Sequence, residues 1–294
     1  MSGRDPFSTY RARLEALGFH PSRQLGQNFL LQPELHRAIA DAGRIDAGDV
    51  VLEIGAGLGF LTRELAERAR QVIAVEIDDR LVTILNEERP RWPHGERVQL
   101  LHADVLQRGR LAPVVGAALA AAGAPWRVVA NLPYAVTGPV LVALCVEVDP
   151  LPAGGSILIQ AEAAERFTAA PATATWGSLS ALVQACFTLR VARKVGAEVF
   201  RPRPNVDSAI LELTRRPAGG LTSAPAAERR RFAAFVRALF SGRRKKARHS
   251  IDAALQAAGL AAASPVEHPL LASRPAELRV DDLLELWQSV RQQS

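Results

Sequence analysis

The chain of 294 residues is predicted to form an α/β fold around a mostly parallel β-sheet, followed by a small all-helical domain. Short apolar runs alternate with helical segments through the first two thirds of the sequence, and most runs are apolar along their whole length. Fully apolar strands separated by helices are typical of a parallel sheet with both faces covered. Beyond these segments the sequence shows only helical patterns.

The expected strands are the short apolar runs at 50–54, 72–75, 98–101, 126–130 and 156–160. The expected helices lie before and between them, at 8–18, 33–43, 60–70, 79–88, 111–122 and 138–146. Two later segments, 182–191 and 209–213, lack a clear helix between them. We expect these two to form an antiparallel hairpin at the edge of the sheet.

The composition of residues 217–227 is typical of a linker. After it, Phe232, Phe235, Val236 and Leu239 recur at helical spacing. The sequence therefore predicts three parts: an α/β domain over 1–216, a linker over 217–227 and a helical domain over 228–294.

With 48% apolar and 22% charged residues, the chain has the composition of a globular protein. The sequence shows no leader pattern and no apolar run long enough to span a bilayer, so we expect a cytoplasmic protein without membrane contact. Cys145 and Cys186 lie in apolar runs and are interpreted as buried thiols, with a disulfide as the alternative. No Cys/His spacing indicates a metal site.

The net charge of +6 favours a polyanionic partner, and nucleic acid is the first candidate. Only 3 of the 36 basic residues are Lys, so codon usage in a GC-rich genome accounts for part of the arginine excess. Five cations gather at a predicted helix start, where they indicate RNA phosphate contacts or a solvated face. They are Arg243, Arg244, Lys245, Lys246 and Arg248.

A glycine-rich loop, Gly55-Ala56-Gly57-Leu58-Gly59, directly follows the first strand, and Glu76 ends the second strand 21 residues after Gly55. Glycines let the backbone approach a ligand closely, and the carboxylate is placed to accept both hydroxyls of a ribose. Residue 60 is Phe, so the dinucleotide fingerprint fails. The pattern suits S-adenosylmethionine, while a nicotinamide cofactor or a structural turn remain alternatives.

Asp104 and the tetrapeptide Asn131-Leu132-Pro133-Tyr134 follow the third and fourth strands. The carboxyl ends of parallel strands bind ligands in open α/β sheets, so these groups are expected to share one site. The Asn131 amide oxygen and the Leu132 or Pro133 carbonyl can accept both N–H bonds of an exocyclic amine, which frees its lone pair. Tyr134 offers a ring for stacking. An ordinary strand-to-helix turn with a buried Tyr is the alternative.

On these residues the chain resembles the ribosomal RNA adenine-N6 dimethyltransferases, which have a Rossmann-like class I methyltransferase core, and most closely the small-subunit branch. The resemblance covers nearly the whole chain. Its motifs are Gln24-Leu25-Gly26-Gln27-Asn28-Phe29-Leu30, Glu53 to Gly59, Val75 to Asp78, Asp104, Asn131 to Tyr134, Gln160-Ala161-Glu162 with Arg166, Phe200 to Ser208 and Arg243 to Lys246.

The resemblance implies roles for individual residues. S-adenosylmethionine would contact Asn28, Leu30, Gly55, Gly57, Glu76, Asp104 and Asn131. The target base would be held by Asn131, Leu132, Pro133 and Tyr134. Phe200, in a proline-rich segment expected to be exposed, would stack on the other face of the base.

The implied reaction adds four methyl groups to two adjacent adenosines near the 3′ end of 16S rRNA, in the small subunit or its precursor. It needs no general base, and we expect a monomer. Four positions depart from the family pattern. Ala161 replaces a Lys that would contact phosphate, and Ala135 replaces a frequent Asn. Arg23-Gln24 stands where a Lys usually precedes Leu25, and Lys246 stands where the basic run usually has a Thr.

Two other functions stay open. A 23S rRNA adenine methyltransferase of antibiotic resistance has the same fold, although Leu132 favours the small-subunit branch, because the resistance branch tends to Ile there. A non-catalytic assembly or transcription factor could also keep the fold. Such a factor would tolerate loss of Gly57, Glu76 or Asn131, and all three are present.

Overall fold

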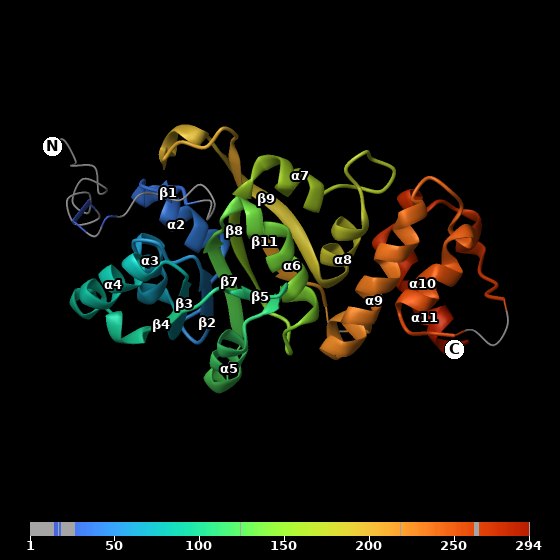
Figure 1. Ribbon diagram of the computed structural model, residues 1–294, viewed down its shortest axis with the longest axis horizontal. Coiled ribbons are helices and arrows are strands. Elements are labelled where there is room, and N and C mark those ends of the chain that lie inside the picture. The colour runs from blue at the N-terminus through green and yellow to red at the C-terminus, as the bar shows by residue number, and fades with distance from the viewer. Residues whose placement is uncertain are drawn as a thin grey trace. The chain divides into compact units, whose positions relative to one another are not determined.

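The computed structural model describes residues 15–16, 18, 27–123, 125–217, 219–261 and 265–293 (Figure 1). Almost all of the helix expected over 8–18 lies outside these residues, as do Gln24, Leu25 and Gly26 of the first motif.

A seven-stranded sheet with the order β4-β3-β2-β7-β8-β11-β9 forms the centre of the α/β part (Figure 1). The pairs β2–β3, β3–β4, β2–β7 and β7–β8 are parallel, as predicted. The five strands predicted between residues 50 and 160, and the strand predicted at 209–213, are confirmed to within two residues at each end. The strand bounds are β2 Val50–Ile54, β3 Gln71–Glu76, β4 Val98–His102, β7 Trp126–Asn131, β8 Gly154–Gln160, β9 Phe187–Val195 and β11 Ser208–Arg215.

The strand order reverses direction between β2 and β7. From β2 the chain proceeds outward to β3 and β4, and then returns to place β7 on the other side of β2. At such a switch point the connections after the two neighbouring strands leave in opposite directions, which opens a crevice at their carboxyl ends. The crevice lies between the ends of β2 and β7, at Ile54 and Asn131.

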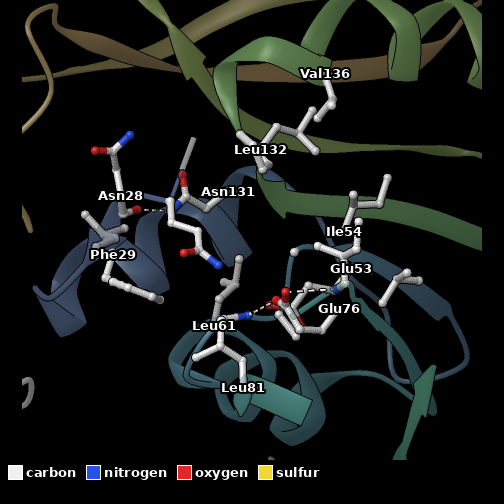
Figure 2. A pocket seen from close by; sticks show the side chains of 18 of the residues that line it. Asn28, Phe29, Glu53, Ile54, Leu61, Glu76, Leu81, Asn131, Leu132 and Val136 are labelled. Carbon is white, nitrogen blue, oxygen red and sulfur yellow. Dashed lines mark hydrogen bonds between the residues drawn. The ribbon is translucent and has the colours of Figure 1, made fainter. Parts of the chain in front are cut away.

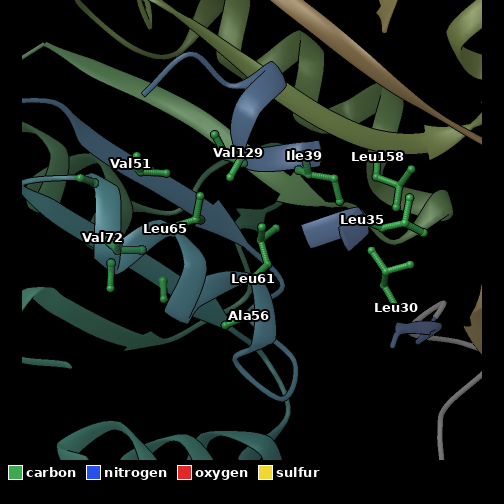
Figure 3. Close-up of a cluster of buried hydrophobic side chains, with 14 of the residues drawn as sticks. Leu30, Leu35, Ile39, Val51, Ala56, Leu61, Leu65, Val72, Val129 and Leu158 are labelled. Carbon is green, nitrogen blue, oxygen red and sulfur yellow. The ribbon is translucent and has the colours of Figure 1, made fainter. Parts of the chain in front are cut away.

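Helices α2 and α3 pack on the sheet through apolar side chains at helical spacing (Figure 3). Leu35 and Ile39 of α2 and Leu61 and Leu65 of α3 belong to one buried cluster with sheet residues that include Val129. The proline at the start of α2 favours the first helical turn. The bounds of the helices in this part are α2 Pro33–Ala42, α3 Phe60–Arg68, α4 Asp79–Glu88, α5 Pro113–Ala122 and α6 Thr137–Val146.

Two helices differ from the expectation. Residues 182–186, predicted as strand, complete helix α8 (Ser178–Cys186), and only then does β9 begin. Most residues of α8 are buried, so no polar face reveals its period, and a short apolar run cannot be assigned from periodicity alone. Helix α7 (Ala161–Phe167) was not predicted either. The strands β9 and β11 do lie next to each other at the edge of the sheet.

The remaining elements are short. Two small ribbons pair β1 (Phe29–Leu30) with β10 (Phe200–Arg201) and β5 (Leu106–Gln107) with β6 (Arg110–Leu111). The 3₁₀ turns are η1 Arg89–Arg91, η2 Gly95–Arg97, η3 Tyr134–Val136, η4 Ala197–Val199, η5 Gly220–Ser223, η6 Phe240–Gly242, η7 Ala247–His249, η8 Pro269–Ala272 and η9 Pro275–Glu277.

The chain divides into two compact units that interleave along the sequence. The first contains the described residues up to Val140 together with 152–161 and 191–213. The second combines 141–151, 162–190 and the chain from Thr214 onward. Its C-terminal helices are α9 (Ala226–Leu239), α10 (Ile251–Ala257) and α11 (Val280–Gln292), as the helical patterns predicted. The domain boundaries at 216 and 228 stay predictions.

Arg229 is the polar centre of the second unit. Its guanidinium is 1% exposed and donates hydrogen bonds to the carbonyl oxygens of Cys145, Ala224 and Val148, with the first at 2.8 Å. A buried guanidinium is tolerated only when its donors are satisfied. Arg229 therefore ties helix α9 to the chain around residues 145–148.

Cys145 and Cys186 are both buried free thiols, as predicted. Burial raises the pKa of Cys145, and its hydrogen bond with Cys186 acts in the same direction. Over the described ranges, no helix has the length and apolarity needed to cross a membrane. Within the same residues, no group of three His, Cys, Asp or Glu side chains is placed to hold a metal ion.

Replacing Arg229 with Met should lower the free energy of unfolding by about 3 kcal/mol, because three buried carbonyl oxygens lose their donor. Chemical denaturation monitored by circular dichroism measures the change. Arg231→Met on the same helix is the matched control, since Arg231 is exposed and its guanidinium donates to the carbonyls of Ala258 and Gly259. An equal loss of unfolding free energy in the two variants would contradict the stabilising role given to Arg229.

Candidate active site

A cavity of about 220 Å³ occupies the crevice at the carboxyl ends of β2, β3 and β7 (Figure 2). In Figure 2, Asn28 and Phe29 lie across the pocket from Glu53 and Glu76. The structure brings together every residue for which the sequence predicted a cofactor or base contact. Lining this one cavity are Asn28, Leu30, Gly55, Gly57, Glu76, Asp104, Asn131, Leu132, Pro133, Tyr134 and Phe200.

The glycine loop closes the end of β2 in a conformation that favours glycine. Gly57 has φ of +58° and Gly59 has φ of +79°, in the left-handed region. A Cβ atom at Gly59 would also lie 2.3 Å from the Trp92 ring. The Gly55 and Ala56 amides donate to the Val75 carbonyl at 2.8 and 3.1 Å. The loop is thereby held against β3, next to Glu76.

Glu76 is buried at 5% exposure and held by three backbone amides. Its Oε2 accepts a bond from Gly57 N at 2.8 Å, and its Oε1 accepts bonds from Ile77 N at 2.9 Å and Asp78 N at 3.0 Å. Burial raises the pKa of Glu76, and the three N–H donors act against this shift. Each carboxylate oxygen can accept about two hydrogen bonds. Oε2 therefore keeps a position for a ligand hydroxyl, and the contact of Glu76 with both ribose hydroxyls stays a prediction.

Glu53, in the middle of the apolar strand β2, lines the same cavity. It is 1% exposed, and its Oε2 has no hydrogen-bond partner among the described residues. Burial raises the pKa of Glu53 to about 8; the nearby Thr62 hydroxyl lowers it, and the charge of Glu76 raises it further. Glu53 is therefore protonated at neutral pH. No role for Glu53 is predicted from the sequence, although a lone carboxylate in an apolar strand is a visible signal.

The structure distinguishes the two carbonyls proposed to hold an amine. The Pro133 carbonyl already accepts bonds from Val136 N at 3.1 Å and Thr137 Oγ1 at 3.5 Å. The Leu132 carbonyl accepts none within the described part of the chain. The Asn131 Nδ2 donates weakly to Asn28 O at 3.4 Å, which leaves the amide oxygen as an acceptor. Asn131 Oδ1 and Leu132 O are thus the available acceptor pair.

Tyr134 and Phe200 differ in accessibility. The half-buried Tyr134 shares a hydrogen bond of 2.7 Å with Ser208 Oγ, which fixes its ring, and burial raises its pKa. Phe200 was expected to be exposed, but only 1% of its surface is accessible. The reason is that β10 pairs with β1, with Phe200 opposite Leu30, and both side chains join the main apolar cluster. Phe200 contributes to the cavity wall from within this cluster.

The basic cluster, defined as Arg244, Lys245, Lys246 and Arg248, lies in the second unit. It was predicted at a helix start, but Arg244, Lys245 and Lys246 lie in the turn between η6 and η7, and Arg248 lies in η7. Helix α9 has already ended at Leu239, and Gly242 and consecutive like charges disfavour its continuation. All four side chains are exposed and form no ion pair among the described residues. Arg243 is different, because its guanidinium donates to the carbonyls of Thr173 and Ala174.

Comparison with known protein families shows to which family the chain belongs. Residues 18–285 match the family model described as ribosomal RNA adenine dimethylase. The chain belongs to this family. Members use S-adenosyl-L-methionine, and this cavity fits that molecule: its backbone conformation favours glycine where the loop passes the ligand, and its walls carry buried carboxylates for hydroxyl and cationic groups.

Two relatives carry the name ribosomal RNA small subunit methyltransferase A. The protein of Streptococcus agalactiae is 43% identical over 206 residues, covering 70% of this chain and 69% of its own. The protein of Geobacillus thermodenitrificans is 39% identical over 234 residues, covering 79% of this chain and 76% of its own.

Two solved structures share the fold. A dimethyladenosine transferase from Plasmodium falciparum has a TM-score of 0.70 at 22% identity, covering 90% of this chain and 98% of its own. The 23S rRNA methyltransferase ErmE has a TM-score of 0.63 at 28% identity, covering 90% of this chain and all of its own. The class I methyltransferase fold is therefore confirmed, and the chain is an rRNA adenine dimethyltransferase.

Replacing Glu76 with Ala should weaken binding of S-adenosylhomocysteine about 10- to 100-fold, because a charged acceptor is lost and the Gly57 amide loses its partner. Isothermal titration calorimetry measures the affinity. Asp79→Ala is the control, since Asp79 is exposed, is not among the residues that line the cavity, and forms an ion pair with the exposed His102. An unchanged affinity in the Glu76 variant would refute the cofactor assignment of this residue.

Glu53→Gln should make cofactor-free protein more stable than wild type, increasingly so as the pH rises from about 5 to 8. The folded protein keeps a proton, with the pKa of Glu53 at about 8, that the unfolded chain releases near 4.5. The stability that this proton contributes is complete below pH 4.5 and declines by about 1.4 kcal/mol per pH unit until pH 8. A glutamine side chain has no titrating group, so the Glu53→Gln variant does not show this decline in stability. Thermal melts at several pH values test this, and parallel curves for both proteins would contradict it.

Proposed function

We propose that this protein dimethylates the N6 amino groups of two adjacent adenosines near the 3′ end of 16S rRNA during maturation of the small ribosomal subunit. The observation that carries the proposal is the acceptor pair Asn131 Oδ1 and Leu132 O, from two residues that line the same cavity as the glycine loop and Glu76. The relatives at about 40% identity, named small-subunit methyltransferases, support the choice of subunit.

The protein's own groups act by alignment and polarisation. Asn131 Oδ1 and Leu132 O accept the two hydrogens of the N6 amine, so its lone pair is no longer committed to the ring. The cofactor supplies a methyl group on a sulfonium, which is already a good leaving group. No side chain has to remove a proton first, because the amine becomes acidic once it is methylated. The contribution of the site is therefore mainly geometric.

The adenine must leave its stack to reach this cavity, and aromatic side chains compensate for the lost stacking. Tyr134, fixed by Ser208, offers one ring. Phe200 is proposed for the other face, and because it is buried, a local rearrangement of β10 must uncover it. The second methylation requires the monomethylated amine to rotate, so that its remaining N–H meets one of the two acceptors.

The test is methylation of purified, undermodified ribosomal subunits with labelled S-adenosylmethionine, followed by mass spectrometry of rRNA fragments. We expect two dimethyladenosines in the small-subunit rRNA and none in the large-subunit rRNA. The similarity to ErmE makes a 23S rRNA methyltransferase the second candidate. Methylation confined to the large subunit would support that candidate, and no methylation of either subunit would favour a non-catalytic assembly factor.

The basic cluster is proposed to contact rRNA phosphates. Replacing Arg244, Lys245, Lys246 and Arg248 together with Ala should weaken subunit binding, most strongly at low salt. It should also reduce the slope of log affinity against log salt by up to about three, since each phosphate contact contributes about 0.7 to 0.9. Filter binding across a salt series measures both effects.

The control for the basic cluster is Arg274→Ala combined with Arg279→Ala, because both arginines are already paired with acidic side chains. This control should leave the salt slope unchanged. If it changes the slope as much as the cluster variant does, net charge and not the cluster determines binding. Since Ala161 lacks the amine that relatives often carry, we expect the cluster to supply a larger share of the affinity here.

The protein is further proposed to act as a monomer in the cytoplasm, where ribosomal subunits mature. Sedimentation at micromolar concentration should give the mass of one chain, 31.7 kDa.

A further inference from the structure

The cofactor cavity is lined by carboxylic acids and contains no fixed cation. Glu53, Glu76 and Asp104 line it, while none of the described lining residues is Lys or Arg. The one imidazole in the wall is His36, whose pKa burial lowers to about 4, so it is neutral at physiological pH. The cavity therefore favours a positively charged ligand.

Glu53 is the most constrained of these acids. Its side chain is 1% exposed, and its Oε2 lacks any hydrogen-bond partner in the described structure. A buried carboxylate without a partner is costly, whereas a buried neutral carboxyl costs far less. Glu53 is one of the residues that line the cavity, so a group bound there is placed to supply the partner that Oε2 lacks among the described residues.

We propose that Glu53 is a proton-exchanging group of the cofactor site, which is protonated in the cofactor-free protein and releases its proton to solvent when a cationic group of the cofactor binds. The cation then compensates the new carboxylate charge. The proposal rests on the binding of S-adenosylmethionine and is independent of which RNA is methylated.

The other groups around Glu53 set the direction of this exchange. From β3, the carboxylate of Glu76 opposes ionisation of Glu53. From α3, the hydroxyl of Thr62 favours it. From α2, His36 is neutral, and Asn131 of β7 carries no charge. Asp104 after β4 is exposed to solvent. With no protein cation lining the cavity, a cation on the ligand is the group that can drive ionisation.

Two cationic groups of the ligand are candidates, the α-ammonium and the sulfonium. The product, S-adenosylhomocysteine, keeps the ammonium but has a neutral thioether in place of the sulfonium. If the sulfonium is the partner, Glu53 is reprotonated once the methyl group has been transferred, and the product is bound less tightly than the substrate. If the ammonium is the partner, binding of either ligand releases the same number of protons from Glu53.

The experiment is calorimetric titration of each ligand into the whole protein, in two buffers with different ionisation enthalpies at the same pH. At pH 7 the wild type should release close to one proton on binding S-adenosylmethionine, and Glu53→Gln close to none. The wild-type affinity should rise about tenfold between pH 6 and 7 and level off above about pH 8. The ligand's own amino group contributes equally to the proton release measured with wild type and with Glu53→Gln. The difference in proton release between the two proteins therefore reports on Glu53.

Thr62→Val is the second variant, and it retains Glu53. Because it removes a group that favours ionisation, it should shift the midpoint of the affinity curve to higher pH. Proton release on binding of both ligands identifies the ammonium as the partner of Glu53. Proton release on binding of S-adenosylmethionine alone identifies the sulfonium as the partner. Equal proton release by wild type and Glu53→Gln, with no shift in Thr62→Val, overturns the proposal. Failure of the subunit assay would refute the rRNA substrate and leave this proposal intact.

Discussion

The hydrogen bond from the Gly57 amide to the Glu76 carboxylate is the interaction on which the site depends. It joins the loop after β2 to the end of β3, and the two other amides on Glu76 come from the turn that starts α4. One buried charge therefore fixes the geometry of three segments. Because an ionised carboxylate is tolerated in an apolar setting only with such donors, the loop cannot move away without a large electrostatic penalty.

The position of the site follows from topology. The reversal of strand order between β2 and β7 makes two binding segments, the glycine loop and the Asn131 turn, neighbours in space although about 75 residues separate them in sequence. A cofactor with its reactive group between these segments would lie against the base that the Asn131 turn is proposed to hold. The same sheet thus provides both halves of a two-ligand reaction, and loops need only supply the contacts.

Much of this was predictable from sequence, because strand ends and glycine patterns are local signals. The sheet, the cofactor loop, Glu76 and the Asn131 turn all belong to this class. What could not be predicted depends on tertiary pairing. Phe200 looked exposed between prolines, yet pairing of β10 with β1 buries it. The apolar helix α8 resembled a strand because packing on all sides removes the helical period. The position of Glu53 in an apolar strand was visible in the sequence, but its raised pKa follows from the nearly complete burial that only the structure shows.

The ribbon formed by β1 and β10 has a thermodynamic consequence. Leu30, at the cofactor side, is the direct pairing partner of Phe200, the proposed platform for the base. A base that displaces Phe200 must disturb the backbone pairing that also positions Leu30, so occupancy by one ligand alters the free energy of binding of the other. Such linkage is reciprocal. Through the ribbon, binding of the RNA and binding of the methyl donor would be cooperative within a single small domain.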